Sequence, residues 1–252
     1  MNFWKIFFKT LEPIILTCTI ACGLHAFCMD MWLFHIEAPC HFFVVCGKLF
    51  YGFDLSFVAA YVFYLMTVHY PDTRKKKIIY ATSDFPTIAI VTNIEIMFVD
   101  MAKAQGQMIS HKDLNCELIK KILSLTQCYA PSTMNRFQYQ NANSFKSIPI
   151  NWIDYIQERE NTWRKFIAEI RPLFSQFDSE YISAVTNIDQ CEFSTPITAM
   201  VSRSNSLNGN NNVLMTFSNG LEEFFLDIYK KSQVLRRIVE KYRTIYGYFS
   251  GV

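Results

Sequence analysis

The sequence predicts a mainly α-helical membrane protein, in which a two-helix transmembrane hairpin precedes a helix-rich cytoplasmic domain. Hydrophobic residues make up 51% of the chain, which excludes a disordered protein because disorder requires low hydrophobicity and high net charge. Basic residues are rare near the start, since residues 1–70 contain only Lys5, Lys9 and Lys48. The composition therefore divides the chain into a hairpin at 1–70 and a cytoplasmic domain at 71–252.

Two apolar segments are long enough to cross a bilayer, which takes about 20 predominantly apolar residues. They are 13–34 and 49–68, and they predict the two helices of the hairpin. Two alternatives stay open. The first segment follows two lysines, and residues 19–22 approximate a lipoprotein cleavage site, so it also fits a signal peptide. Both segments also fit buried helices of a wholly soluble protein.

Positive charge flanks the hairpin on one side. Two lysines precede the first segment, and a basic cluster, Arg74, Lys75, Lys76 and Lys77, follows the second. The connector around 35–46 contains neither Lys nor Arg. Because positively charged flanks stay in the cytoplasm, we expect both termini there and the basic cluster against anionic headgroups of the lipid bilayer.

Four ionisable residues lie within or beside the apolar segments: His25, Asp30, Lys48 and Asp54. Ionisable groups at membrane depth are costly and usually face a partner or water, so these residues are candidates for helix–helix contacts or a polar lining. In the alternative reading, Asp30, Lys48 and Asp54 lie at the outer interface and His25 bonds a backbone carbonyl.

The cytoplasmic part is expected to be mainly helical. A helix is predicted to run to about Lys103 and to end at Gly106, with a short strand at 87–92 as the alternative. The other expected elements are a helix at 111–129 with Ser110 as its N-cap, a loop at 131–150, a helical run at 151–185 divided at Pro172, a flexible polar stretch at 187–212 and a last helix at 220–247.

No motif of a known catalytic site is present. The chain lacks a Gly-rich phosphate-binding loop, a nucleophile elbow and an HExxH helix, so no enzyme activity, catalytic residue or cofactor is expected. The last histidine in the chain, His111, is read as part of a solvated helical turn. Four carboxylates are read as solvated helix faces: Glu158, Glu160, Glu222 and Glu223.

Metal binding is not expected either. The connector contains potential ligands, namely His35, Glu37, Cys40, His41 and Cys46, but their spacing matches no strong motif, and a disulfide or loop packing explains them equally well. The cytoplasmic part has no CxxC pair, which favours free thiols in a reducing compartment.

A basic face is predicted on the last helix. It comprises Lys230, Lys231, Arg236, Arg237 and Lys241. This face suits a nucleic acid, the membrane surface or an acidic partner, and a merely solvated face is the alternative. The net charge of the chain is only +2, which gives no overall field for nucleic-acid binding.

The order of these features resembles bacterial anti-phage membrane effectors of the SLATT-type and retron-associated two-transmembrane classes. The resemblance covers layout only: two apolar segments, the basic cluster and a helix-rich domain. It implies a protein of the bacterial inner membrane, held in check by an inhibitory protein or nucleoprotein partner, whose hairpins assemble into a homo-oligomer and permeabilise the membrane. The competing classes are an adaptor or receptor that only recruits partners and an enzyme with an unrecognised site.

Overall fold

The computed structural model describes residues 10–32, 35–36, 41–141, 144–206, 215–218 and 220–247. The chain is mainly α-helical, as the sequence predicts. It divides into two compact units, one made of the described residues up to Ile78 with 243–247, and one made of Ile79–Tyr242.

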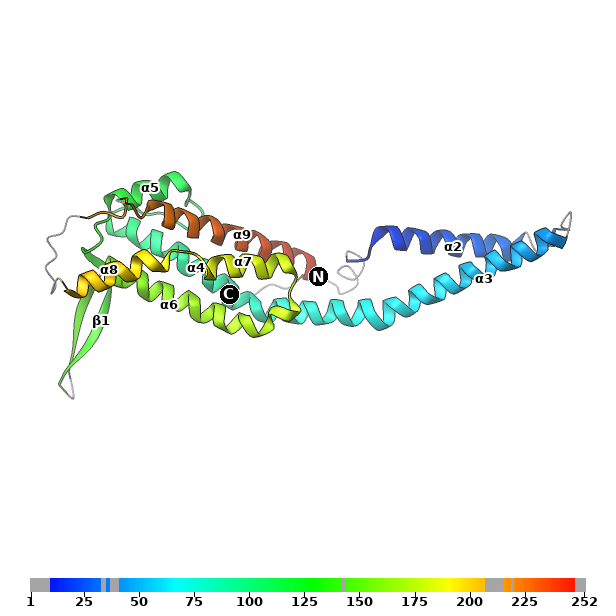
Figure 1. Cartoon of the computed structure of the whole chain (residues 1–252), viewed down its shortest axis with the longest axis horizontal. Helices are drawn as coiled ribbons and strands as arrows, with labels where there is room; N and C mark the ends of the chain where they lie inside the picture. The colour runs from blue at the N-terminus through cyan, green and yellow to red at the C-terminus, as the bar shows by residue number, and fades with distance from the viewer. Residues whose placement is uncertain are drawn as a thin grey trace. The chain divides into compact units, whose positions relative to one another are not determined.

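The first unit is a pair of antiparallel helices (Figure 1). Helix α2 (Pro13–Met31) begins with a proline, which the first turn tolerates, and helix α3 (His41–Tyr64) follows it. The missing side chain of Gly47 leaves room for Met29 of the opposite helix. A Cβ atom added at Gly47 of α3 would lie 3.0 Å from Cε of Met29 in α2.

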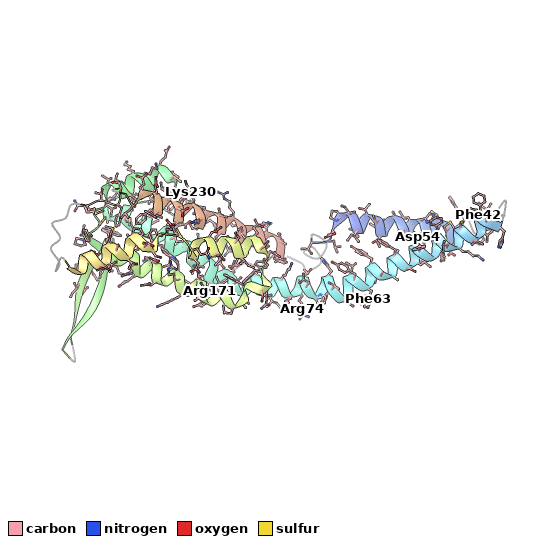
Figure 2. All side chains as sticks on the ribbon, viewed as in Figure 1. Phe42, Asp54, Phe63, Arg74, Arg171 and Lys230 are labelled. Carbon is pink, nitrogen blue, oxygen red and sulfur yellow. The ribbon has the colours of Figure 1, made fainter. Side chains whose placement is uncertain are left out.

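Both membrane-length segments are confirmed as helices long and apolar enough to span a membrane. Many large apolar side chains of these two helices are exposed and are not packed against other parts of the chain. Phe42 and Phe63 of α3 point away from the helix pair (Figure 2), and each is 68% exposed. The second helix begins at His41 and not at Leu49, because residues 41–48 are apolar enough to extend it without a break.

The chain stays helical from α3 to the end of the next long helix, with no loop between them. A π-helical turn, η2 (Leu65–His69), follows α3, and helix α4 (Tyr70–Ala104) follows the turn. The basic cluster 74–77 therefore lies within a helix. Pro86 also lies inside α4, although a proline removes one backbone donor from a helix.

The second part of α4 is the centre of the second unit. The large apolar side chains of one broad face are buried, namely Ile90, Val91, Ile94, Met97, Phe98 and Met101, whereas Ile88 and Ile96 are half-buried. A broad apolar face of this kind has to be covered by neighbouring elements. The predicted helix at 87–103 is confirmed, and Gly106 follows its end with φ +76°.

The remaining helices and strands of the second unit surround α4 (Figure 1). Phe98 of α4 contacts Phe225 edge-to-face, Phe85 contacts Phe166, and Thr87 shares a hydrogen bond with Tyr181. The elements are α5 (Cys116–Leu125), β1 (Pro131–Asn141), β2 (Ser144–Asn151), α6 (Trp152–Ile170), the 3-10 helix η3 (Arg171–Gln176), α7 (Ser179–Asp189), α8 (Ser194–Ser206) and α9 (Glu222–Tyr246).

The predicted start of the helix after Gly106 is wrong. Asn115, and not Ser110, caps α5 by accepting a hydrogen bond from Leu118 N. The Ser110 amide instead donates to the carboxylate of Asp113 at 2.8 Å, and this bond lowers the pKa of Asp113. Both residues are good N-caps, so tertiary packing selects between them.

The predicted loop at 131–150 is also wrong, since β1 and β2 form an antiparallel hairpin there. Asn and Pro residues favour turns, but here Pro131, Asn135, Asn141 and Pro149 are paired positions of a two-stranded ladder. Pro149 lies opposite Asn135, where a two-stranded hairpin accepts a residue without an amide proton on its outer edge.

The division of the 151–185 run at Pro172 is confirmed, because α6 ends at Ile170 and α7 begins at Ser179. The predicted flexible stretch is wrong over Ser194–Ser206, which forms helix α8. The last predicted helix is confirmed as α9, and Gly220 and Gly247 flank it with positive φ.

Candidate functional site

A polar pair lies midway along the two membrane-length helices. His25 Nδ1 of α2 lies 2.5 Å from Asp54 Oδ2 of α3. Cys22 lies one turn before His25 on α2 and is close to the same carboxylate. The Asp54 side chain is 15% exposed, whereas that of His25 is 51% exposed. The Asp54 carboxylate is therefore largely covered, whereas the His25 ring is open on one side.

Asp54 lies further from the start of its helix than the sequence predicts. The sequence places it near the start of the second segment, but α3 begins at His41, so Asp54 lies ~20 Å along the helix at 1.5 Å per residue. Asp30 and Lys48 are exposed. Both lie toward the connector of the hairpin, Asp30 in the last turn of α2 and Lys48 in an early turn of α3.

The basic cluster is largely open to solvent. Arg74 and Lys75 are exposed, and Arg74 projects from α4 (Figure 2). Nζ of Lys76 lies 3.5 Å from Oδ2 of Asp72, which is one turn earlier on the same helix. An exposed i,i+4 pair contributes only a few tenths of a kcal/mol, so the cluster keeps its capacity to meet anions.

The predicted basic face of α9 consists of residues in different settings. Lys231 pairs with Asp227 of the same helix at 2.6 Å, and Lys241 pairs with Glu180 of α7 at 2.5 Å. Arg236 reaches the buried Glu95 of α4. Lys230 and Arg237 are exposed. Three of the five cations therefore already contact carboxylates within the second unit.

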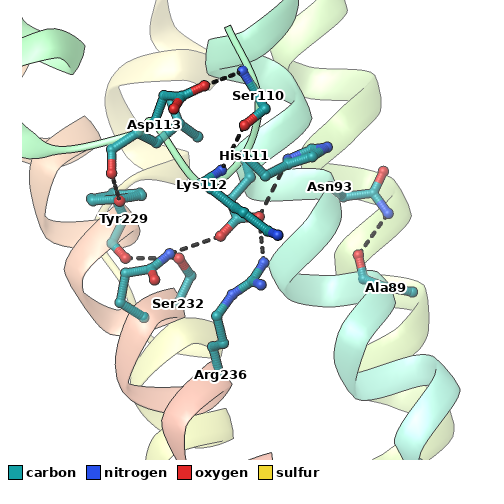
Figure 3. Close-up of polar contacts among 12 residues, drawn as sticks. Ala89, Asn93, Ser110, His111, Lys112, Asp113, Tyr229, Ser232 and Arg236 are labelled. Atoms are coloured by element: carbon teal, nitrogen blue, oxygen red, sulfur yellow. Dashed lines mark hydrogen bonds and ion pairs between the residues drawn. The ribbon is translucent and has the colours of Figure 1, made fainter. Parts of the chain in front are cut away.

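Glu95 is the centre of a polar cluster that the sequence analysis did not single out. Its Oε2 accepts a hydrogen bond from Arg236 at 2.5 Å and lies 3.3 Å from His111 Nδ1, and its Oε1 accepts one from Gln233 at 2.8 Å. In Figure 3 the side chains of His111 and Arg236 converge from the loop after α4 and from α9. This cluster fixes three segments together.

The Glu95 cluster carries one signal in the sequence. Glu95 is the only acid among residues 85–99, which are otherwise mostly apolar. Burying a carboxylate is costly unless it is paired, so a lone acid in a buried helix predicts a cationic partner. The partner itself, Arg236, lies far along the chain and carries no local signal. The reading of His111 as a solvated turn misses its contact with Glu95.

The reading of Glu160 as a solvated carboxylate is wrong, because it is buried in α6. It accepts hydrogen bonds from Arg164 at 2.8 Å and from the Ser194 hydroxyl. Arg164 also reaches Asp189 at the end of α7. The network joins α6, α7 and α8 and is a structural element of the second unit.

Two of the three described cysteines of the second unit, Cys128 and Cys191, are buried, and Cys116 is half-buried. Cys116, Cys128 and Cys191 are free. Burial raises the pKa of Cys128 to about 12, so its nucleophilic thiolate form is scarce at neutral pH. Among the described residues, no group of three or more His, Cys, Asp or Glu side chains is arranged to hold a metal ion. Glu37 and Cys40 lie outside these residues.

A tyrosine cluster surrounds Asp178. Its carboxylate accepts hydrogen bonds from the hydroxyls of Tyr80 and Tyr242, each at 2.9 Å. The rings of these tyrosines stack with their centroids 4.0 Å apart. Burial is the main cause that raises the pKa of Tyr80 above its ordinary value, so this phenol stays a hydrogen-bond donor at neutral pH.

Comparison with known proteins found no matching family model, no matching curated protein and no matching solved structure.

Proposed function

We propose that this chain is a membrane-anchored effector of phage defence, whose α2–α3 hairpins assemble with other copies and permeabilise the bacterial inner membrane. The observation that carries the proposal is the exposure of His25 beside its carboxylate partner, midway along two membrane-length helices. A charged group at the bilayer centre costs about 2.5–3.5 kcal/mol or more. A second hairpin that covers His25 removes this cost.

Assembly follows from the size of the hairpin as well. Two helices cannot enclose a water-filled path, so conduction or leakage requires several copies. When hairpins associate through the His25 surface, the polar pair and the neighbouring Cys22 face the shared interior, while the large apolar side chains face lipid. The basic cluster at 74–77 supports cytoplasmic placement of the helical unit, because positive flanks are retained there.

The helical unit is proposed to control this assembly. Its core is built on α4, the same helix that continues from η2. A partner that binds this unit, such as an inhibitory protein or a nucleoprotein, can therefore act on the helix that leads from the hairpin. The context of phage defence comes from the resemblance in layout described above.

The membrane topology gives a first expected outcome. A reporter fused after Gly106 and a second one fused at Val252 should both give a cytoplasmic signal, because positive charge lies on only one side of the hairpin. Activities of paired phosphatase and fluorescent-protein fusions measure this. A periplasmic signal from either fusion contradicts the topology and favours a cleaved first segment.

The polar pair gives a second expected outcome. The double variant His25→Leu and Asp54→Leu should insert into the membrane at least as well as the wild type, but expression should no longer collapse the membrane potential. The reason is that the polar interior is lost while apolarity increases. A potential-sensitive dye in growing cells, at matched protein levels, measures the effect.

The matched control is Thr17→Leu. Thr17 is an exposed polar residue of α2 whose hydroxyl already donates to the Pro13 carbonyl at 2.7 Å, so its removal should leave the activity intact. Equal loss of potential with the wild type and the double variant removes the polar pair from the mechanism.

The alternative function is a membrane-tethered adaptor that recruits partners without chemistry of its own. The specific observation in its favour is the β1–β2 hairpin, which extends from the helices (Figure 1) and forms a two-stranded sheet among the described residues. An open strand edge can pair with a strand of another protein. Recruitment of a partner without any change in membrane potential favours this alternative.

A further inference from the structure

A small cavity of about 100 Å³ lies in the first unit, where the chain enters α2 beside the end of α3. Its walls come from the segment before α2 and its first turn, and from α3 and the π-helical turn η2. The lining residues are Thr10, Leu11, Glu12, Ile15, Tyr61, Tyr64 and His69. π-helical turns occur often at functional sites.

The polar groups around the cavity form an aromatic and acidic wall. The rings of Tyr61 and Tyr64 stack with centroids 6.3 Å apart, and the ring of His69 lies 6.3 Å from that of Tyr64. Thr10 and His69 share a hydrogen bond of 3.2 Å that ties the two walls together. Glu12 is the one charged residue of the lining, and it is exposed.

Tyr61 provides the independent evidence for a ligand. Its side chain is buried, with the residue 7% exposed, yet its hydroxyl has no hydrogen-bond partner among the described residues. A buried hydroxyl without a partner is costly, so a group that supplies one is favoured. A ligand in this cavity can donate to the hydroxyl oxygen.

The chemistry of the lining selects a cation. One carboxylate and a set of aromatic faces attract an ammonium group through charge and cation–π interactions, whereas an anion finds no Lys or Arg side chain in the lining. A primary ammonium can in addition donate hydrogen bonds to the Glu12 carboxylate and the Tyr61 oxygen. A trimethylammonium group has no proton to donate.

Size and location restrict the ligand further. A cavity of 150 Å³ holds benzene, so about 100 Å³ suits an aminoethyl group and excludes a whole lipid. The cavity lies at the end of the membrane-length part of α2 and α3. The basic cluster begins with Arg74, ~7.5 Å along the helix axis from His69, so cations that can meet lipid phosphates lie at a similar level along the helix.

We propose that this cavity binds the primary ammonium group of an ethanolamine headgroup, with Glu12 and Tyr61 as hydrogen-bond acceptors. The proposal rests on membrane insertion in the proposed function but not on permeabilisation. Binding would hold the start of α2 against η2 and thereby make the conformation of the hairpin sensitive to the lipid around it.

The test is binding to the purified full chain in detergent, measured by native mass spectrometry with short-chain phosphatidylethanolamine, phosphatidylcholine and phosphatidylglycerol. We expect retention of the ethanolamine lipid in preference to the other two. Glu12→Gln should weaken its binding about tenfold or more, because a charge-assisted hydrogen bond is lost. Tyr61→Phe should weaken binding less, and Glu223→Gln, which alters an exposed carboxylate on α9, should not change it.

Free ethanolamine distinguishes the two sources of the ammonium group. Competition at concentrations equal to those of the lipid identifies a soluble amine as the ligand, and competition only at far higher concentrations identifies the lipid headgroup. Equal retention of all three lipids, or unchanged binding in both Glu12→Gln and Tyr61→Phe, overturns the proposal. Flotation of the same protein with vesicles reports membrane insertion separately, so that the failure of the proposed function is recognised on its own.

Discussion

Replacing Arg236 with methionine should destabilise the helical unit by about 3 kcal/mol. The change leaves Glu95 buried, with its side chain 2% exposed, after the loss of the cation that lies 2.5 Å from its carboxylate. Breaking a buried ion pair by removing one partner typically costs about 3–5 kcal/mol. We expect the lower end of this range because Gln233 and His111 still contact Glu95.

Thermal unfolding of the full chain in detergent, followed by circular dichroism, measures this effect. A loss of 3 kcal/mol corresponds to a decrease in Tm of about 6–12 °C for a domain of this size. Arg237→Met is the matched control, because Arg237 is the exposed neighbour on α9 and its replacement should change the Tm little. Equal Tm values for the two variants would show that Glu95 does not depend on Arg236.

The second large effect is expected for Trp163→Ala, which should destabilise the same unit by about 3–5 kcal/mol. Trp163 is 1% exposed in the middle of α6, and its ring lies 5.7 Å from that of Phe193. Removing the indole leaves a cavity that a close-packed interior cannot fully close. The Tm should fall by about 6–20 °C.

Lys165→Ala is the control for this variant, because Lys165 is exposed on the same helix. Its Tm should stay within about 2 °C of the wild type, as expected for a surface substitution. If Trp163→Ala unfolds at the temperature of this control, the apolar stripe of α6 is not a core surface.

Long periodic segments were predictable from the sequence because their apolar residues recur on one face over many turns. The helices around Trp163 and Phe225 follow this rule, and Pro172 marks the division between α6 and α7 as expected. Short segments rich in Asn, Ser and Pro were not predictable, since the same residues occur in loops, in the β1–β2 hairpin and in α8.

The polar residues of the hairpin could be selected from sequence, but their pairing could not. A charge in an apolar run is conspicuous on its own, which is why His25 and Asp54 were both candidates. Their contact depends on the antiparallel register of α2 and α3, and this register follows from side-chain packing at positions such as Gly47 and Met29. Likewise, Glu95 and Arg236 are 141 residues apart, so only the tertiary fold brings them together.

The central claim, that assembled hairpins permeabilise a membrane, is tested most directly by dye release from liposomes that contain the purified full chain. Release should increase more steeply than in proportion to the ratio of protein to lipid, because several hairpins must meet. Limited proteolysis of the exposed helical unit provides a second condition that removes any inhibition by that unit. No release at any ratio, before or after proteolysis and with insertion verified by flotation, would contradict the account.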